Sequence, residues 1–207
     1  MALLVIGATG ALGRDVVAES LEASHPTVAL VRDPERAELP REVELRKGDV
    51  VQPETLVASL NEVDTVICTF GTPNFRRPSA VLREGTVNLV NAMRQEGVRR
   101  LVCVTLLGTG ASRTNTSLLY RAVILRALAP MVPDKEAQEQ VVRTSGLDWT
   151  LVRPPRFRGS SPRGSLRVIR NNGDGRVGQV VRRDLARFLF RCAISEEYIG
   201  EAVVVGS

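Results

Sequence analysis

Apolar runs alternate with helix-period segments along most of the chain. The first run, residues 3–6, leads into a glycine-containing turn, an amphipathic segment to about residue 23 and a second apolar run at 28–31. This order predicts a strand, a turn, a helix and a second strand. Further strands are predicted at 42–45, 64–70, 100–107, 149–152, 166–169, 179–181 and 202–205, and further helices from near 53, over 78–97, from 116 within a mixed segment to 131, at 134–145 and at 184–193.

The alternation predicts an α/β fold. We expect one Rossmann-like, doubly wound domain over residues 1–207, with a mostly parallel sheet and helices on both faces. A chain of 207 residues with 43% hydrophobic content can form one core, but it is too short to add a separate catalytic domain to a nucleotide-binding fold. The substrate site is therefore expected in the same domain, formed by the loops after the fourth, fifth and sixth main strands and by the C-terminal segment.

The composition indicates where in the cell the protein is expected and the state of its cysteines. No run approaches the roughly 18 apolar residues of a membrane span, and Met1 leads into a strand without a basic n-region, so we expect a cytoplasmic protein without a membrane anchor. Cys68, Cys103 and Cys192 are odd in number and lie in apolar surroundings. This pattern predicts reduced core thiols and no structural metal.

The net charge of +5 comes almost entirely from arginine, because Lys47 and Lys135 are the only lysines. A basic balance suits an anionic ligand. The densest arginine cluster lies between residues 153 and 170 and has only Phe157 as an aromatic neighbour. Without interleaved aromatic residues or a nucleic-acid motif, the cluster argues against nucleic acid as a partner.

The turn after the first predicted strand has the spacing G-x-x-G-x-x-G, at Gly7, Gly10 and Gly13, with Ala8 where the commoner G-x-G-x-x-G has its first glycine. A turn that passes close to a pyrophosphate needs glycine, because a Cβ would collide with the phosphates. The following helix start supplies free N–H groups and a positive dipole end. The motif predicts a dinucleotide site; the alternative is an ordinary glycine-rich turn.

Charged residues after the next strands indicate which dinucleotide is bound. Arg32, at the end of the second strand, and Arg36 offer two guanidinium groups to a 2′-phosphate, which favours NADP over NAD. The alternative is a polar turn containing Arg32 and the competing acid Asp33. Asp49 follows the third strand, where it either accepts a hydrogen bond from the adenine amino group or caps the helix near Pro53; these roles are not exclusive.

The segments GATGALG, VRDPER, GDV, EGTVNLVNAM and SGLDWTLVRPP resemble the atypical short-chain dehydrogenase/reductase group that includes the NmrA-like NAD(P)-binding proteins. Their order and spacing are most similar to the biliverdin reductase B (flavin reductase) branch, and the resemblance covers nearly the whole chain. It implies NADP(H) as cofactor. The implied ligands are Gly7, Thr9, Gly10, Leu12 and Gly13 at the pyrophosphate, Arg32 and Arg36 at the 2′-phosphate, Asp49 and Val50 at the adenine, Phe70, Gly71 and Thr72 along the middle, and Thr105, Pro154 and Pro155 at the nicotinamide.

The catalytic positions depart from the standard pattern of a serine after the fifth strand and Tyr-x-x-x-Lys on the next helix. That tyrosine works because the lysine lowers its pKa, which lets the phenol exchange a proton with a carbonyl oxygen. Here Leu106 replaces the serine, and Met131 stands four residues before Lys135. Tyr120 is not the missing tyrosine, because Ile124 stands four residues after it. Arg156 replaces a histidine of the biliverdin reductase B pattern.

Without a positioned phenol, ketone reduction loses its acid, whereas hydride transfer to an electron-poor ring can take its proton from water. The first hypothesis is therefore an NADPH-dependent reductase of a flavin, tetrapyrrole or quinone-like acceptor, acting as a monomer or small homo-oligomer. In it Lys135 is the candidate catalytic residue that holds the nicotinamide ribose. Arg156 and Arg158 attract the acceptor's anionic groups, or Arg156 is merely a surface cation. The alternative function is a non-catalytic NADP(H)-binding sensor or scaffold of the NmrA-like type, and a third is an epimerase or isomerase.

Overall fold

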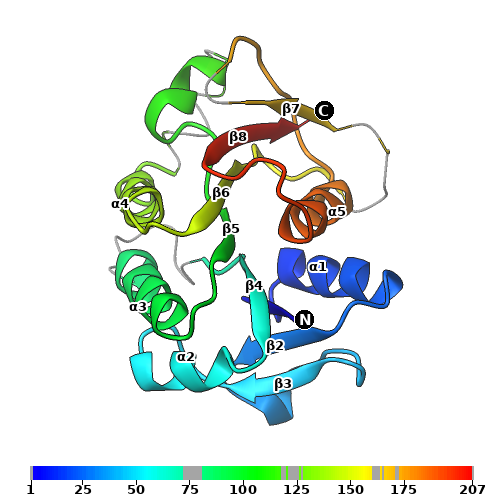
Figure 1. Cartoon of the computed structure of the whole chain (residues 1–207). Coiled ribbons are helices and arrows are strands. Elements are labelled where there is room, and N and C mark those ends of the chain that lie inside the picture. The colour runs from blue at the N-terminus through cyan, green and yellow to red at the C-terminus, as the bar shows by residue number, and fades with distance from the viewer. Residues whose placement is uncertain are drawn as a thin grey trace.

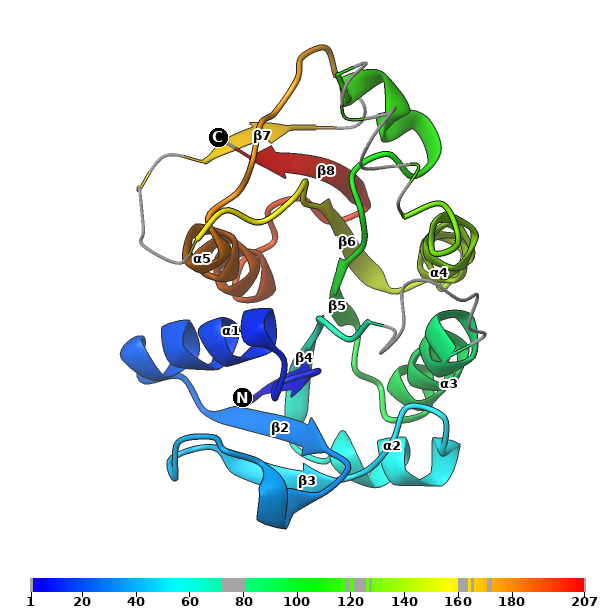
Figure 2. The same cartoon turned by 180° about the vertical axis from the view of Figure 1, so that it is seen from behind.

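The computed structural model describes residues 2–71, 81–117, 120, 126, 128–159, 164, 166–170 and 173–206. Its strands form one eight-stranded sheet (Figures 1 and 2). They are β1 (Ala2–Ile6), β2 (Thr27–Val31), β3 (Glu44–Lys47), β4 (Val63–Cys68), β5 (Arg100–Val104), β6 (Asp148–Arg153), β7 (Arg167–Ile169) and β8 (Glu201–Gly206).

The strand order is β3-β2-β1-β4-β5-β6-β8-β7. All neighbouring pairs are parallel except β7 with β8, which is antiparallel at the sheet edge. The chain runs outward from β1 to β3 and then returns to place β4 on the other side of β1. In doubly wound sheets this reversal leaves a crevice at the carboxyl ends of the strands, where ligands bind.

Helices cover both faces of the sheet (Figures 1 and 2). One face carries α1 (Ala11–Glu22) and α5 (Arg182–Ala193), and the other carries α2 (Pro53–Ser59), α3 (Val81–Gln95) and α4 (Val132–Arg143). This arrangement confirms the predicted α/β fold class. None of the helices in the described part of the chain has the length and apolarity that crossing a bilayer requires.

Burial on both faces explains why the strands are continuously apolar. In β1, Leu3 and Val5 join the core cluster that contains residues of α1 and α5, while Leu4 and Ile6 join the cluster beneath α2 and α3. Successive side chains of a strand point to opposite faces, so a central parallel strand needs apolar residues at every position. The N-terminal run therefore places the following turn at the centre of the sheet.

Four strand predictions need correction. The third strand lies at Glu44–Lys47, two residues beyond the predicted 42–45, because the exposed β3 edge lacks a strong apolar pattern. The predicted strand at 179–181 does not form; Val180 makes only an isolated bridge to Phe157. Strands β4 and β5 also end earlier than predicted, at Cys68 and Val104. Residues 69–71 after β4 line a cavity at the sheet edge, whereas Thr105 and Leu107 keep backbone hydrogen bonds to Val152 and Pro154.

The start of α4 also differs from the prediction. The helix begins at Val132, two residues before the predicted start at Asp134, so Asp134 is not its cap; Met131 is the N-cap residue, without a side-chain hydrogen bond, and Pro133 lies in the first turn. Proline suits this position because the first helical N–H groups have no partner within the helix. Asp134 remains in the first turn, where a carboxylate is favourable to the helix dipole.

Candidate functional site

A cavity of about 350 Å³ lies at the carboxyl edge of the sheet, where the strand order reverses between β1 and β4. It joins segments that are far apart in sequence: the glycine turn after β1, the end of β2, the loop after β3 and the loop after β4. Its lining residues are Ile6, Gly7, Thr9, Gly10, Leu30, Val31, Arg32, Gly48, Asp49, Val50, Thr69, Phe70, Gly71 and Val81.

The glycine turn has a conformation that only glycine meets without strain. Gly7 has φ +84°, and a Cβ on Gly13 would lie 2.1 Å from the Gly7 carbonyl oxygen. Gly10 is the N-cap of α1, with no side-chain cap and no acidic residue in the first turn. The amide groups that begin α1 therefore suit an anion. This cradle fits the pyrophosphate of a dinucleotide, whereas the Leu12 side chain packs against the core rather than lining the cavity.

Arginines and carboxylates surround the outer end of the cavity. Arg32 lines it and is exposed, whereas Arg36 lies outside the lining and pairs with Asp33 at 3.3 Å. The Asp33 carboxylate also accepts a hydrogen bond from the Glu35 amide, so the segment is a polar turn that still presents two guanidinium groups. The polar-turn interpretation and the phosphate interpretation are therefore compatible.

Asp49 lies in the cavity wall, and its carboxylate accepts a hydrogen bond from the Val51 amide at 3.2 Å. The proposed capping role is wrong, because α2 begins after Gln52 and Gln52 is its N-cap. Beside it, the Val50 carbonyl accepts a hydrogen bond from Asn88 Nδ2 at 2.9 Å. The wall expected to contact adenine is thus fixed to α3.

Phe70 and Gly71 line the cavity beside the glycine turn. A Cβ on Gly71 would meet no atom of the described residues within 4 Å. Thr72, the third residue expected along the middle of the cofactor, lies outside the described residues.

The residues expected at the nicotinamide end belong to a buried polar network. Thr105 and Thr109 donate hydrogen bonds to the Glu139 carboxylate at 2.8 and 2.7 Å. Arg153, at the end of β6, donates to both oxygens of the same carboxylate, at 2.9 and 2.5 Å. Glu139 therefore joins the loop after β5 to the end of β6. The Pro154 carbonyl accepts from the Leu107 amide at 3.0 Å, and Pro154 and Pro155 are buried.

Electrostatics keep Glu139 ionised. Burial opposes its charge, yet hydrogen bonds and the positive charge of Arg153, together with the two threonine hydroxyls, lower the pKa of Glu139 below its usual value. The paired charges and hydroxyls leave no orphaned ionic group in this network, which is the condition for a buried ion pair to be tolerated.

Lys135 is buried one helical turn before Glu139. Its ammonium donates to the Val104 carbonyl at 3.2 Å and to Gln138 Oε1 at 2.9 Å. Burial lowers the pKa of Lys135, a change that the nearby Cys103 and Cys68 thiols partly oppose. Lys135 is not among the residues lining the cavity, so its role at the nicotinamide ribose remains a prediction.

The two hydroxyl residues of the standard catalytic pattern, a serine and a tyrosine, have no counterpart among the described residues near Lys135. Leu106 is buried at the serine position, as the sequence indicated. Burial raises the pKa of Tyr120 to about 12, and its hydroxyl has no hydrogen-bond partner among the described residues. A phenol with a raised pKa is a poor acid at neutral pH, which supports the conclusion that Tyr120 is not the missing catalytic tyrosine.

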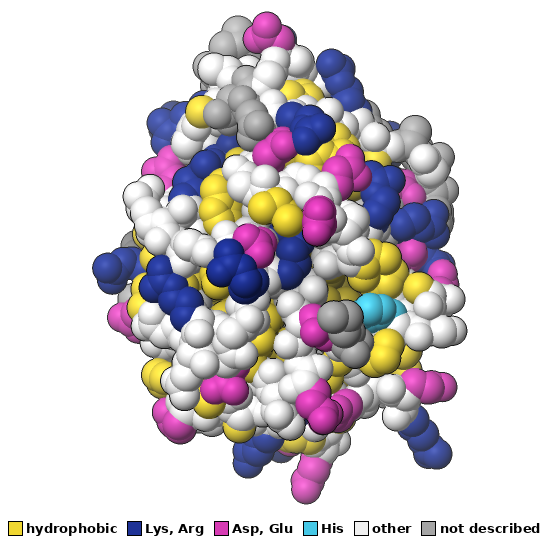
Figure 3. Space-filling model, viewed as in Figure 1, with side chains coloured by type: hydrophobic (Ala, Val, Ile, Leu, Met, Phe, Trp, Pro, Cys, Tyr) yellow, Lys and Arg dark blue, Asp and Glu magenta, His cyan; other side chains and the backbone are white. Residues whose placement is uncertain are grey.

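The arginines after residue 153 do not form a single basic surface. Arg153 is buried against Glu139, and Arg170 pairs with Glu201. Arg156 and Arg158 are exposed at the carboxyl end of β6, in a segment whose backbone hydrogen bonds to Val180. On the face shown in Figure 3, basic side chains are interspersed with acidic ones.

The model of a protein family described as NAD(P)H-binding matches residues 7–196 of the chain. The chain belongs to this NAD(P)H-binding family. The match confirms the resemblance to NAD(P)-binding short-chain dehydrogenase/reductase proteins that the motifs indicated, and it makes NAD(P)(H) the ligand class of the fold.

The individual relatives share a third or less of their residues with this chain. The chain is 33% identical over 192 residues to an NAD(P)H azoreductase of Xenophilus azovorans and covers 60% of it, from 89% of its own length. It is 26% identical to the photosystem II assembly factor Ycf39 of Synechocystis, of which it covers 58%, from 92% of its own length. The anaerobillin reductase ChuY of Escherichia coli O157:H7 shares the fold, with a TM-score of 0.81, 22% identity and coverage of 100% of this chain and 97% of that one.

Two residues that support the site, Glu139 and Asn88, could not be recognised from the sequence. Glu139 lies in the segment Lys135-Glu136-Ala137-Gln138-Glu139, but nothing in the letters links it to Arg153. Asn88 of α3 holds the cavity wall at Val50 through its side-chain amide.

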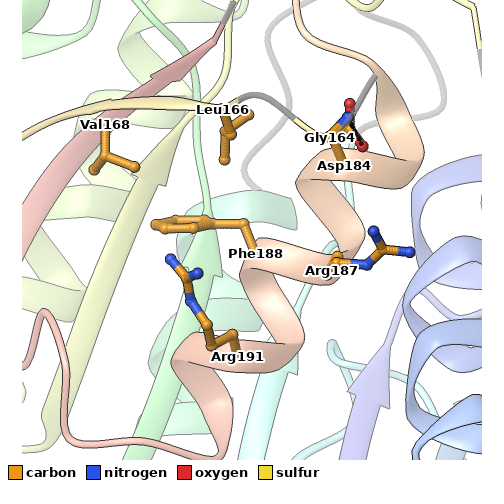
Figure 4. A pocket seen from close by; sticks show the side chains of 7 residues that line it. All are labelled: Gly164, Leu166, Val168, Asp184, Arg187, Phe188 and Arg191. Carbon is orange, nitrogen blue, oxygen red and sulfur yellow. Dashed lines mark hydrogen bonds between the residues drawn. The ribbon is translucent and has the colours of Figure 1, made fainter. Parts of the chain in front are cut away.

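A further cavity of about 160 Å³ lies between α5 and β7 and shares no lining residue with the first (Figure 4). Its cations are already engaged: Arg187 pairs with Glu19, and the Arg191 guanidinium lies 5.5 Å from the centre of the Phe188 ring. Leu166 and Val168 form its apolar side, so it is a packing gap at the edge of the core rather than a charged binding site.

Proposed function

We propose that the protein is an NADPH-dependent reductase that transfers hydride to a conjugated small-molecule acceptor such as a flavin. The observation that carries the proposal is the cavity at the strand reversal, which is lined by the glycine turn, Arg32 and Asp49 together. Relatives named as an azoreductase and an anaerobillin reductase support the reaction class. When bound, the nicotinamide supplies the hydride.

In this proposal the residues of the chain bind and orient the NADPH. Gly7, Thr9, Gly10 and Gly13, with the backbone at Leu12, hold the pyrophosphate, and Asp49 and Val50 flank the adenine. Arg32 offers an exposed guanidinium to the 2′-phosphate, and Arg36 adds a second once it leaves Asp33. A phosphate dianion favours this pair of cations, which is the reason for preferring NADPH to NADH.

The acceptor is proposed to bind where the loop after β5 meets the start of α4. A cavity of about 580 Å³ lies there, lined by Gly108, Arg113, Arg126, Ala129, Val132, Pro133 and Glu136. Arg156 follows the carboxyl end of β6 and is exposed, outside the lining of this cavity, and we propose that it attracts an anionic group of the acceptor. Lys135, Thr105, Pro154 and Pro155 then shape the nicotinamide end between the two binding regions.

The test begins with calorimetric titration of NADPH and NADH into the purified protein. Consumption of NADPH is then followed by absorbance with FMN, an azo dye and a linear tetrapyrrole as separate acceptors. Arg32→Ala should remove most of the preference for NADPH, by about tenfold for loss of one charge-assisted contact. If NADPH does not bind the wild-type protein, the proposed function is wrong; if Arg32→Ala leaves the preference intact, the 2′-phosphate assignment is wrong.

A second candidate is a non-catalytic NADP(H)-binding sensor. It is favoured by one observation: Leu106 and Met131 occupy the serine and tyrosine positions, and the Lys135 ammonium is engaged by Val104 and Gln138. The same assay separates the two functions. Tight NADPH binding without turnover on any acceptor of the panel supports the sensor.

A further inference from the structure

Arg14 occupies an unusual position for a cation. Its amide makes an early hydrogen bond of α1, to the Gly10 carbonyl at 2.9 Å, so its side chain leaves the helix next to the glycine turn. The amino end of a helix carries a positive dipole end, which disfavours an arginine there and favours an anion. The first turn of α1 holds no acidic residue that would offset this charge.

The guanidinium of Arg14 is held by two partners. Its Nε donates to the Thr9 carbonyl at 3.0 Å, and Thr9 is part of the cavity wall. Its other end contacts a Glu38 carboxylate oxygen at 3.3 Å. Arg14 therefore connects the glycine turn to the loop after β2, the loop that also carries Arg32 and Arg36.

The pair with Glu38 is easily exchanged. The Arg14 side chain is 44% exposed and that of Glu38 is 85% exposed. Ion pairs as exposed as this contribute little to stability, because water and salt screen them. Charge-assisted, bidentate contacts of arginine with phosphate are stronger, so a phosphate dianion placed here would displace the carboxylate.

We propose that Arg14 is a further ligand of the adenosine 2′-phosphate and that Glu38 holds it in the free protein as a competing carboxylate. The inference rests on the proposed function, because it deepens the NADP(H) site described above. Arg36 has the same arrangement with Asp33, at 3.3 Å. Arg14 is not itself a lining residue of the cavity and reaches it through the Thr9 carbonyl. In this proposal each arginine is held by an acid until a phosphate takes the place of the acid, and Glu38 limits affinity while Arg14 adds to it.

The experiment compares adenosine 2′,5′-bisphosphate with ADP, which lacks the 2′-phosphate, by calorimetry on the full-length protein. Arg14→Ala should weaken binding of the bisphosphate by about 5- to 30-fold and leave ADP within about twofold. Glu38→Gln, which keeps the size of the side chain, should tighten the bisphosphate by about two- to fivefold and leave ADP unchanged. Arg14→Lys keeps the charge but loses the planar fork, so its affinity should fall between those of the wild type and Arg14→Ala.

The control is Arg99→Ala. Arg99 forms an exposed ion pair with Asp148 at 3.1 Å, before β5 at the opposite edge of the sheet, so its removal should change neither nucleotide. An equal loss for both nucleotides in Arg14→Ala would mean that Arg14 only supports the turn, and no change would also overturn the proposal. Wild-type protein that binds neither nucleotide overturns the proposed function itself, whereas wild-type selectivity that survives in Arg14→Ala overturns only the role of Arg14. Because Glu38 is exposed, its variant tests the same idea without risk to folding.

Discussion

The two halves of the carboxyl edge use charge in opposite ways. Around β1, β2 and the loops that follow them, the charged pairs Arg14–Glu38 and Arg36–Asp33 are exposed. None of these four residues lines the cavity, but Arg14 contacts the cavity-lining residue Thr9, and Asp33 directly follows the cavity-lining residue Arg32. Around β5, β6 and α4, Glu139 and Arg153 are 5% and 2% exposed and are saturated with hydrogen bonds. Exposed pairs can exchange partners with a ligand, whereas buried pairs fix the loops that carry them.

This difference assigns ligand binding to the half with exposed charges and stability to the half with buried charges. In the nucleotide half, affinity depends on cations that a phosphate can recruit, and removing one should change binding more than stability. In the half beside α4, Glu139 joins Thr105, Thr109 and Arg153, so removing it should change stability first. The predictions below test this division in order of expected size.

The largest effect is expected from Glu139→Gln. The neutral amide removes the carboxylate charge that pairs with the buried Arg153 guanidinium, and breaking a buried ion pair costs about 3–5 kcal/mol of unfolding free energy. Denaturant titration measures the loss. Glu38→Gln is the matched control, because it removes a carboxylate from an exposed pair and should cost less than about 1 kcal/mol. Equal losses in the two variants would contradict the division of the edge.

The lowered pKa of Glu139 also makes the stability of the protein depend on pH. The pKa of Glu139 is lower in the folded protein than its ordinary value, so the folded state binds fewer protons than the unfolded state in the interval between the two values. Its contribution to stability is therefore complete above the unfolded-state pKa of about 4.3 and is lost as the pH falls through the lowered folded-state pKa. Glu139→Gln should remove this component of acid destabilisation and flatten the profile below that pH.

The next effect is expected from Gly13→Ala in the nucleotide half. The added Cβ would lie 2.1 Å from the Gly7 carbonyl oxygen, so the turn has to move. We expect a loss of about 1–3 kcal/mol in stability, typical of overpacking, and at least about tenfold weaker NADPH binding. Gly71→Ala is the control for stability, because its Cβ would meet no atom within 4 Å in the part of the chain that the structure describes. Unchanged NADPH affinity in Gly13→Ala would separate the turn from the cofactor site.

A smaller effect is expected from Asn88→Ala, which removes the hydrogen bond to the Val50 carbonyl. Loss of one such bond should cost about 1 kcal/mol of stability, and a looser wall should raise the NADPH dissociation constant by about two- to fivefold. Asn91→Ala on the same helix is the matched control, because Asn91 is exposed. Identical behaviour of the two variants would show that Asn88 does not support the cavity.

The nucleotide half of the carboxyl edge could be predicted from the sequence because its residues follow local patterns, whereas the half beside α4 could not. Gly7, Gly10 and Gly13 lie within one turn, and Arg32 follows directly from a strand end, so spacing alone places them at the same edge. The partnership of Glu139 with Arg153 joins a helix to a strand, and only the packing of α4 against the sheet makes it visible. Spacing also gives no sign that Lys135 turns inward, because burial on a helix depends on what packs against it. Exposed arginines such as Arg14 are missed for another reason: their role depends on a partner, Glu38, in a separate loop.

The smallest effect is expected from Arg156→Ala, which tests where the acceptor binds. Arg156 is exposed after β6 and its side chain supports no described core contact, so stability should be unchanged. If it attracts an anionic group of the acceptor, the KM for that acceptor should rise by about two- to fivefold while the NADPH dissociation constant stays the same, because the lost contact is with the substrate alone. Arg41→Ala, an exposed arginine in the loop before β3, controls for the general loss of positive charge. An equal rise in KM for both variants would make Arg156 an ordinary surface cation, and the half of the edge beside α4 would then bind its acceptor without it.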